Sequence, residues 1–281
     1  MSRSGSWQDH AARARSFSVG ADRYAAVRPS YPADAVSWLL GGDDGADGES
    51  GAGRIGSLGA AGLSDPRKAG SLRVLDLAAG TGKLTKALVA HGGFDVVAVE
   101  PSEPMLAQLR AALPSVESHI GTAEAIPLPD ASVDAVVCGQ AWHWFDEKAA
   151  AAEEARVLKP GGTVGIIWND RDESVDWVAR FNAIIHQGDQ LEPDALHRAP
   201  RLGSTFGPVQ HRTFTWVDVV PTASLRPLAA SRSYLLTLPS AKRDALLAQI
   251  DQLVATHPAL KGRESVPLPY HTNAYRSFKL G

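Results

Sequence analysis

Short apolar runs alternate with amphipathic segments of helical length in the middle of the chain. Four runs rich in β-branched residues stand at 72–77 (LRVLDL), 95–99 (DVVAV), 133–138 (VDAVVC) and 163–168 (TVGIIW). Such runs are typical of strands buried on both faces. The segments between them that carry apolar residues at helical spacing are 83–91, 104–113 and 148–158. The alternation predicts an α/β fold in which right-handed crossovers join the strands of a parallel sheet.

The last third of the chain departs from this rhythm. The segments 177–187, 224–236 and 241–257 have helical spacing, whereas 209–217 and 269–279 are typical of strands. We expect the two late strands to complete the sheet, and helical insertions to cap its edge at about 174–200 and 222–258. No second hydrophobic core is visible in the sequence. This favours one capped domain over the two that 281 residues allow.

Glycine is unevenly distributed along the chain. Ten of the 26 glycines lie between positions 41 and 70, in a stretch without apolar periodicity. Such a composition is typical of a flexible surface loop. We therefore divide the chain into an N-terminal helical lid at 1–40, a flexible glycine-rich linker at 41–70 and a main domain at 71–281.

The overall composition is that of a globular protein, with 44% hydrophobic and 21% charged residues. A net charge of -3 disfavours nucleic acid and anionic membranes as partners. No segment offers the ~20 apolar residues of a membrane-spanning helix, and the charged N-terminus does not resemble a signal peptide. A single cysteine, Cys138, excludes an intrachain disulfide and a cysteine-rich zinc site. We expect a cytoplasmic protein without a metal site, and the sequence leaves its oligomeric state open.

The segment with the clearest chemistry is DLAAGTGKLT at 76–85, between the first predicted strand and the first predicted helix. A phosphate-binding Walker loop would need glycine at position 77 and serine or threonine at position 84, and both positions hold leucine. A dinucleotide-binding fingerprint would need a third glycine where Thr85 stands. This difference argues against NAD as the ligand without excluding it. A tight turn that binds no ligand is a further alternative.

The segment resembles the first motif of class I S-adenosylmethionine-dependent methyltransferases, Asp-x-x-x-Gly-x-Gly after an apolar strand. The resemblance implies that the backbone at Gly80 and Gly82 approaches the methionine half of this cofactor, because glycine has no Cβ to clash. It also implies a contact with Ala78 in the same loop. It implies that Asp76 accepts a hydrogen bond from the cofactor's amino group or from a bridging water. It also implies a Rossmann-like doubly wound sheet of seven strands, mostly parallel, with an antiparallel last strand.

Later segments resemble further landmarks of the same family in the same order. Glu100 ends the second strand, where an acidic side chain would accept both ribose hydroxyls. Met105 would pack on the adenine face or lie in the core. Many relatives carry aspartate where Thr122 stands, and Glu124 is either its replacement or a solvated carboxylate. The cofactor contacts implied beyond the first motif are Glu100, Pro101, Met105, Thr122, Ala123, Glu124, Gln140 and Ala141.

A looser resemblance connects the chain to a bacterial and fungal group that includes trans-aconitate-type carboxyl methyltransferases. The segments that carry it are YAAVRPSYP at 24–32, AWHWFD at 141–146 and LPYHT at 268–272. The resemblance implies that Arg28 clamps the carboxylate of the cofactor or of an acidic substrate, while Tyr24 and Tyr31 close over the ligand. A surface position is the alternative for Arg28.

His143 is the candidate general base, because it follows the fourth strand at the carboxyl edge of the sheet, where such folds bind ligands. Trp142, Trp144 and Trp168 are expected to wall the substrate pocket, where an aromatic face would attract the sulfonium. The alternatives are a hydrogen-bonded histidine in an aromatic cluster and tryptophans that belong to the core. A carboxylate acceptor would need no base.

Together these features predict a methyltransferase that uses S-adenosyl-L-methionine to methylate a small-molecule acceptor, such as a carboxylate or a hydroxyl, by in-line transfer. Two alternatives stay open. The first is an NAD(P)-dependent oxidoreductase, in which Gly80, Gly82 and Glu100 would hold the dinucleotide. The second is a protein that binds S-adenosylmethionine without catalysing a reaction.

Overall fold

The computed structural model describes residues 28–42, 71–189 and 199–281. Most of the predicted N-terminal lid, including Tyr24, and positions 43–70 of the predicted linker lie outside these residues. Positions 190–198 of the first predicted helical insertion also lie outside them.

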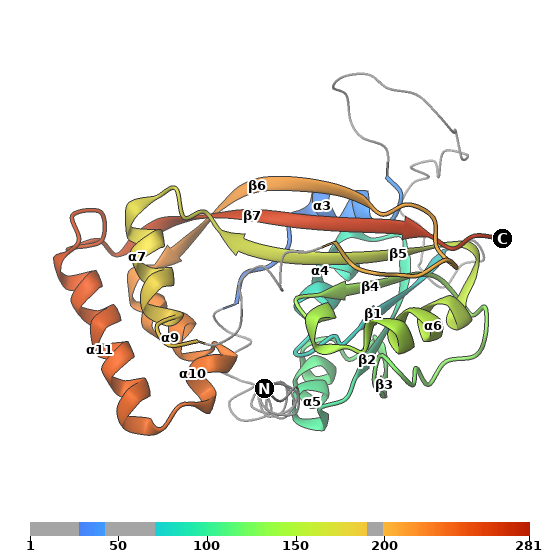
Figure 1. The fold of residues 1–281 in the computed structure, drawn as a ribbon, viewed down its shortest axis with the longest axis horizontal. Helices are drawn as coiled ribbons and strands as arrows, with labels where there is room; N and C mark the ends of the chain where they lie inside the picture. Colours follow the sequence, from blue (N-terminus) through green and yellow to red (C-terminus); the bar gives the residue numbers. More distant parts are fainter. Residues whose placement is uncertain (1–27, 43–70, 190–198) are drawn as a thin grey trace, which may run out of the picture.

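Within these residues, seven strands form one mixed sheet in the order β3-β2-β1-β4-β5-β7-β6. Neighbouring strands pair in parallel except β7, which is antiparallel to both β5 and β6. The predicted Rossmann-like sheet with an antiparallel last strand is therefore confirmed (Figure 1). The strands are β1 (Leu72–Leu77), β2 (Phe94–Glu100), β3 (Glu117–Ile120), β4 (Val133–Gly139), β5 (Leu158–Arg171), β6 (Gln210–Pro221) and β7 (Ser265–Phe278).

Helices cover both faces of the parallel part of the sheet. The helices α3 (Ala33–Leu39), α4 (Lys83–His91) and α5 (Glu103–Ala112) pack on one face, and α6 (Glu147–Val157) packs on the other. Consecutive residues of a strand point to opposite faces. In β1, Val74 packs among side chains of α3 and α4 and Leu75 among those of α6, and both are fully buried. This explains why the run 72–77 is apolar without alternation.

The helix α3 belongs to the core of the sheet and not to a lid. Its side chains Val36 and Leu39 are buried, and they share a hydrophobic cluster with Leu88 of α4 and Ile167 of β5. The part of the predicted lid that the structure describes therefore divides in two. Residues 28–32 run beside the pocket described below, and 33–39 cover the sheet.

Strand β5 extends well beyond the apolar run that predicted it at 163–168. It reaches Arg171, because β7 supplies an antiparallel ladder that pairs Asn169 with Thr272 and Arg171 with Tyr270. Strand β6 likewise continues to Pro221, four residues past its predicted end, and pairs there with the start of β7. Together with the start of β7, these strand ends form an antiparallel extension beyond the parallel sheet (Figure 1).

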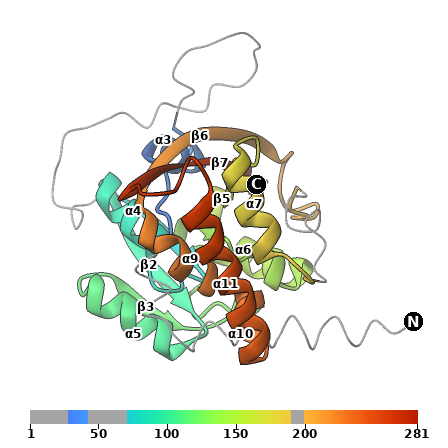
Figure 2. The same ribbon diagram turned by 90° about the vertical axis from the view of Figure 1, so that its left-hand side faces the viewer.

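A second hydrophobic core lies at the far end of this extension, contrary to the expectation of one core. Helices from two chain segments meet there and bury Trp177, Phe181, Leu225 and Ile250 against Tyr270 of β7. Figures 1 and 2 show these helices gathered beyond the parallel sheet, and we call them the helical lobe. Its members are α7 (Asp176–Ile185), the 3₁₀ turn η2 (Thr222–Ser224), α9 (Leu225–Ala230), α10 (Ser233–Thr237) and α11 (Ser240–Thr256).

The helix predicted at 224–236 is broken in two. Ser231 ends α9, and its hydroxyl donates a hydrogen bond to the carbonyl of Leu228 at 2.7 Å. Arg232 then has an extended backbone (φ -73°, ψ 136°) as the N-cap of α10. A serine hydroxyl that bonds to the previous turn competes with the helical ladder, which explains why apolar spacing alone missed the break.

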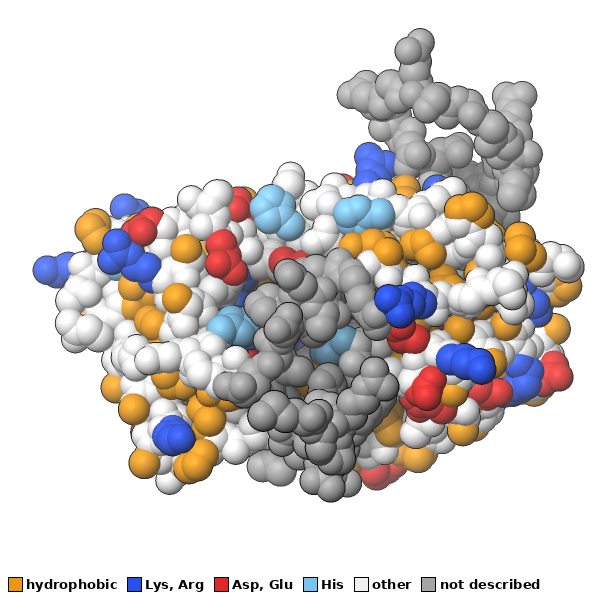
Figure 3. Space-filling model, in the orientation of Figure 1, with side chains coloured by type: hydrophobic (Ala, Val, Ile, Leu, Met, Phe, Trp, Pro, Cys, Tyr) orange, Lys and Arg blue, Asp and Glu red, His pale blue; other side chains and the backbone are white. Residues whose placement is uncertain are grey.

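Charges of both signs are mixed over the face shown in Figure 3. Within the part of the chain that the structure describes, no helix is long and apolar enough to cross a membrane.

Candidate active site

A pocket opens at the carboxyl ends of β1 and β4, where the strand order changes direction. Open α/β sheets bind ligands at this point because the loops after the two strands diverge there. The pocket is lined by the loop after β1, the ends of β4 and β5, the segment before α3, and the helical lobe with β7. The described residues around it include Arg28, Tyr31, Asp76, Ala78, Gly80, Thr81, Lys83, Gly139, Gln140, Asn169, Arg171, Arg232 and Tyr270.

Asp76 provides the buried carboxylate of this pocket. The hydroxyl of Thr85 on α4 donates a hydrogen bond to its Oδ2 at 2.6 Å. Its Oδ1 is buried, and no described residue donates a hydrogen bond to it. Burial raises the pKa of Asp76 to about 7, with a smaller contribution from the nearby charge of Glu100. A buried carboxylate with one open oxygen is a good acceptor for a cationic donor.

The two glycines of the motif have different roles in the structure. Gly80 has a φ of +59°, and a Cβ there would lie 3.8 Å from Cε of Met105, which leaves ordinary contact distance. Gly82 has a φ of +85°, and a Cβ there would lie 2.9 Å from Cγ of Leu109 on α5. Only Gly80 lines the pocket. Gly82 therefore allows α4 and α5 to pack closely, whereas we expected it to face the cofactor.

Two residues other than glycine also have a left-handed backbone at this edge. Ala78, after β1, has a φ of 56°, and Gln140, after β4, has a φ of 60°. Both line the pocket. Such conformations are unfavourable for residues with a Cβ, and they occur often at functional sites, where the surrounding structure holds them in place.

Glu100 lies at the carboxyl end of β2, next to the loop after β1, where it is buried and does not itself line the pocket. Its two oxygens accept hydrogen bonds from the backbone N–H groups of Gly80 and Ser102, each at 2.9 Å. Burial raises the pKa of Glu100, and these two hydrogen bonds oppose that rise. An ionised carboxylate has about four acceptor sites, so this one both holds the loop and retains acceptor capacity.

The other predicted cofactor residues follow the same edge of the sheet. Met105 lies in the first turn of α5 near Gly80, and Thr122 forms a short bridge with Ala125 after β3. Ala123 is buried in the core, and Glu124 accepts a hydrogen bond from the backbone N–H of Asp146 at 3.1 Å. None of these residues lines the pocket itself. Pro101 lies directly after β2 and Ala141 lies two residues after β4, and neither of them lines the pocket.

The predicted aromatic wall does not surround this pocket. Trp142 and Trp168 are both buried in the core cluster on the α6 face. The indole N–H of Trp142 donates to Oε1 of Glu147 at 3.1 Å, because the 3₁₀ turn η1 (Trp142–Trp144) directs this ring toward α6. His143 and Trp144 contact each other with ring centroids 4.5 Å apart, and neither lines the pocket.

Residues that the sequence did not single out complete the pocket. Arg171 ends β5, Arg232 caps α10 and Tyr270 lies in β7. Asn169 also lines the pocket, and its Nδ2 donates to the carbonyl of Ser30 at 2.8 Å. Asn169 and Arg171 lie beyond the end of the predicted strand at 163–168. The sequence resemblance includes Tyr270 within the segment LPYHT without giving it a role. A pairing prediction for β5 and β7 would have placed Arg171 opposite Tyr270.

The segment before α3 contributes the predicted Arg28 and Tyr31. Nη2 of Arg28 donates to the carbonyl of Ser231 at 2.8 Å, which attaches this segment to the helical lobe. A Cβ on Gly139 would lie 2.6 Å from the hydroxyl of Tyr31, so glycine at the end of β4 allows this ring to approach.

The chain is similar to known methyltransferases over most of its length. A family model described as a methyltransferase domain matches residues 75–166, which contain the loop after β1 and the ends of β2, β3 and β4. An uncharacterised methyltransferase of Mycobacterium tuberculosis strain H37Rv is 42% identical over 262 residues, which cover 93% of this chain and 95% of the relative. The chain belongs to the class I S-adenosylmethionine-dependent methyltransferases.

Two further comparisons agree with this family. A methyltransferase-like protein of Schizosaccharomyces pombe is 31% identical to this methyltransferase over 268 residues, which cover 94% of this chain and 96% of the relative. A solved structure from Anaeromyxobacter dehalogenans, described as a candidate type II methyltransferase, has a TM-score of 0.60 and 22% identity. It covers 90% of this chain and 98% of that chain, and at this identity it supports the fold alone.

The residues of the methyltransferase fit S-adenosylmethionine, which it uses as cofactor. The open Oδ1 of Asp76 matches a cationic amino group. Gly80 keeps the loop after β1 free of a side chain, and the remaining acceptor capacity of Glu100 matches a diol. The site therefore offers a polar complement to the charged and hydroxylated parts of the cofactor.

Proposed function

We propose that this methyltransferase methylates an oxygen atom of a small-molecule acceptor, with a carboxylate favoured over a hydroxyl. The observation that carries the proposal is the pocket itself, where the loop after β1 meets Arg171, Arg232 and Tyr270 across a confined space. A polymer would need an extended groove, whereas a pocket lined by both the sheet and the helical lobe suits a metabolite.

In this proposal the cofactor lies along the carboxyl edge of the sheet. Asp76 accepts from its ammonium group and Glu100 from its ribose hydroxyls, while Arg28 pairs with its carboxylate. Met105 and the segment Thr122–Glu124 border the adenine. These assignments are supported by the open oxygen of Asp76, by the placement of Glu100 at the end of β2, and by the position of Arg28 in the pocket lining.

When bound, S-adenosylmethionine supplies a methyl group activated by a sulfonium, and in-line transfer leaves S-adenosylhomocysteine. The protein must align the acceptor and exclude water. Among the described residues that line the pocket there is no histidine, and Asp76 is the only carboxyl group. A hydroxyl acceptor would need a base, whereas a carboxylate is already a nucleophile at neutral pH. The lining therefore favours an ionised acceptor.

A labelled-methyl transfer screen tests the proposal. The protein would be incubated with methyl-labelled S-adenosylmethionine and a panel of metabolite carboxylates, alcohols, phenols and amines. We expect label in base-labile esters formed from carboxylates. Label in amines alone would contradict O-methylation, and no transfer to any acceptor would favour the silent binding protein.

Titration calorimetry with S-adenosylhomocysteine and NAD distinguishes the methyltransferase from an NAD(P)-dependent oxidoreductase. We expect S-adenosylhomocysteine to bind and NAD to bind weakly or not at all. Selective binding of NAD would instead support an oxidoreductase.

A further inference from the structure

Positive side chains outnumber carboxylates around the pocket. Among the described lining residues, Arg28, Lys83, Arg171 and Arg232 are basic and Asp76 is the one acidic residue. The cofactor carries a sulfonium, an ammonium and one carboxylate, so its binding adds net positive charge. Its carboxylate can be matched by one guanidinium. A second ligand that is anionic would complement the basic side chains of this pocket, and Arg171 among them has no ion pair with a described residue.

Arg171 is the basic residue whose surroundings point most clearly to an anion. Its Nη1 donates to Oδ1 of Asn182 at 2.7 Å, and its guanidinium lies over the ring of Phe181, 5.1 Å from the centroid. Its Nε is buried, and within the described ranges no residue accepts a hydrogen bond from it. Arginine is seldom buried without a charged partner. The neutral amide of Asn182 positions this cation without neutralising it.

Arg232 approaches the same pocket from the helical lobe. It is the N-cap of α10, directly after Ser231, whose carbonyl accepts the hydrogen bond from Arg28. At this break Arg232 lines the pocket, and its Nη2 also contacts Nε2 of His186 at 3.4 Å.

Tyr270 adds a neutral hydroxyl beside the guanidinium of Arg171, with which it shares a hydrogen bond, and it lines the same pocket as Arg232. Its ring is buried and stacks on Trp216 with centroids 5.0 Å apart. Burial raises the pKa of the Tyr270 hydroxyl, and the charge of Arg171 opposes that rise. Tyr270 therefore stays protonated at neutral pH, and its O–H can donate a hydrogen bond to an anion in the pocket.

We propose that Arg171 and Arg232 form an anion-binding subsite for the methyl acceptor, and that the acceptor is a small acid with a carboxylate apart from the oxygen that is methylated. This inference rests on the proposed function. Arg171 belongs to the sheet and Arg232 to the helical lobe, so a carboxylate between them contacts both parts of the molecule. Planar guanidinium groups suit this role because they bind carboxylates with two parallel hydrogen bonds.

The test measures acid binding to the protein saturated with S-adenosylhomocysteine. Calorimetry would use succinate, citrate and benzoate within a wider panel of small mono-, di- and tricarboxylates, each beside its neutral amide. We expect at least one acid with two or more carboxylates to bind at least tenfold more tightly than its amide. Arg171→Met and Arg232→Met should each weaken this binding at least tenfold, and Arg171→Lys should recover part of it.

Three controls make each outcome decisive. Arg263→Met removes an exposed arginine in the connection between α11 and β7, outside the pocket lining, and should leave acid binding unchanged. Affinity for S-adenosylhomocysteine should stay within about threefold in every variant, which also shows that each variant is folded. Acids that bind no better than their amides, or that bind Arg171→Met and Arg232→Met as tightly as the wild type, would overturn the subsite. Failure of S-adenosylhomocysteine to bind the wild type would overturn the proposed function as well.

Discussion

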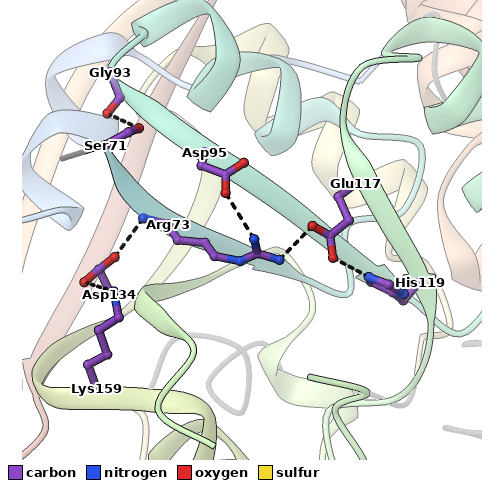
Figure 4. Close-up of polar contacts among 8 residues, drawn as sticks. All are labelled: Ser71, Arg73, Gly93, Asp95, Glu117, His119, Asp134 and Lys159. Carbon is purple, nitrogen blue, oxygen red and sulfur yellow. Dashed lines mark hydrogen bonds and ion pairs between the residues drawn. The ribbon is translucent and has the colours of Figure 1, made fainter. Parts of the chain in front are cut away.

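The two edges of the parallel sheet differ in how their polar groups are satisfied. At the amino edge, charged side chains pair with one another across neighbouring strands (Figure 4). Arg73 on β1 contacts Asp95 on β2 at 3.2 Å and Glu117 on β3 at 2.7 Å, and only its Nε is buried without an acceptor among the described residues. Asp134 on β4 accepts hydrogen bonds from the backbone N–H of Arg73 and from Nζ of Lys159, both at 2.8 Å.

At the carboxyl edge, two polar groups are buried with unsatisfied hydrogen-bonding capacity. Oδ1 of Asp76 and the hydroxyl of Thr81 have no hydrogen-bond partner within the described part of the chain. Ala78 and Gln140 adopt unfavourable backbone conformations at the same edge. Paired charges at the amino edge contribute to the stability of the fold. Buried polar groups without a hydrogen-bond partner lower that stability, and a ligand that bonds to them restores it. The difference indicates which edge binds the cofactor.

The largest expected effect comes from Asp76→Asn. Loss of a charged hydrogen bond contributes about 1.5–3 kcal/mol, so affinity for S-adenosylhomocysteine should fall roughly 10- to 150-fold. The free energy of unfolding should stay equal or rise, because a buried charge with an open oxygen disappears. Calorimetry and urea denaturation measure the two effects. Unchanged affinity would remove Asp76 from the cofactor site.

The pKa of Asp76 makes cofactor affinity depend on pH. With a pKa of about 7, this carboxyl group is mostly protonated at pH 6 and mostly ionised at pH 8. Only the ionised form pairs with an ammonium, so affinity for S-adenosylhomocysteine should rise roughly tenfold over this range. Asp76→Asn should abolish the rise. A wild-type affinity that is constant or falls as the pH increases would contradict this role.

Glu154 is a second buried carboxyl group with unsatisfied oxygens, apart from the pocket. It lies on α6, fully buried, and neither carboxylate oxygen has a partner among the described residues. Burial raises the pKa of Glu154 well above its usual range. We expect Glu154→Met to increase the free energy of unfolding by about 1–3 kcal/mol at pH 8, since a buried unsatisfied group costs about this much.

The sign of the pH dependence follows from the raised pKa. The folded protein keeps the proton of Glu154 that the unfolded chain releases above its ordinary pKa, so this group lowers wild-type stability as pH rises from about 4.5. Urea denaturation between pH 5 and 8 should show a shallower decline in Glu154→Met. Glu264→Met, at an exposed glutamate, should behave like the wild type. An identical decline in all three proteins would contradict the assignment.

A smaller effect is expected at the amino edge from Arg73→Met. Its two ion pairs are partly exposed, so the free energy of unfolding should fall by only about 0.5–2 kcal/mol. Affinity for S-adenosylhomocysteine should stay within about twofold. A loss of affinity as large as that of Asp76→Asn would show that the two edges are not distinct in function.

The smallest effect is expected from His143→Ala. This side chain does not line the pocket, and a carboxylate acceptor needs no base, so kcat with a saturating acceptor should change less than about twofold. A large loss of kcat, together with loss of the acidic limb of its pH profile, would instead identify His143 as the base.

The sequence predicted those elements whose apolar pattern is local. The runs 72–77 and 133–138 are strands because their residues are buried on both faces, and Asp76 and Gly80 lie where the first motif placed them. The end of β5 escaped prediction because Asn169 and Arg171 are polar. Their strand conformation depends on a ladder with β7, about 100 residues later.

The hydrophobic core of the helical lobe could not be predicted either, because it too depends on contacts between distant parts of the sequence. Phe181 and Ile250 meet in one core although about 70 residues separate them, so no local window shows the cluster. The tryptophans illustrate the opposite error. Trp142 follows β4 and Trp168 lies in β5, but both side chains point into the core on the α6 face, a direction that position in the sequence does not show.

The central claim is that the carboxyl edge binds S-adenosylmethionine through its open polar groups. A crystal structure with S-adenosylhomocysteine tests it most directly. We predict that the amino nitrogen of the ligand lies within about 3.2 Å of Oδ1 of Asp76, with the sulfur open toward Arg171 and Tyr270. An amino group bound elsewhere, or a ligand outside the loop after β1, would contradict the claim.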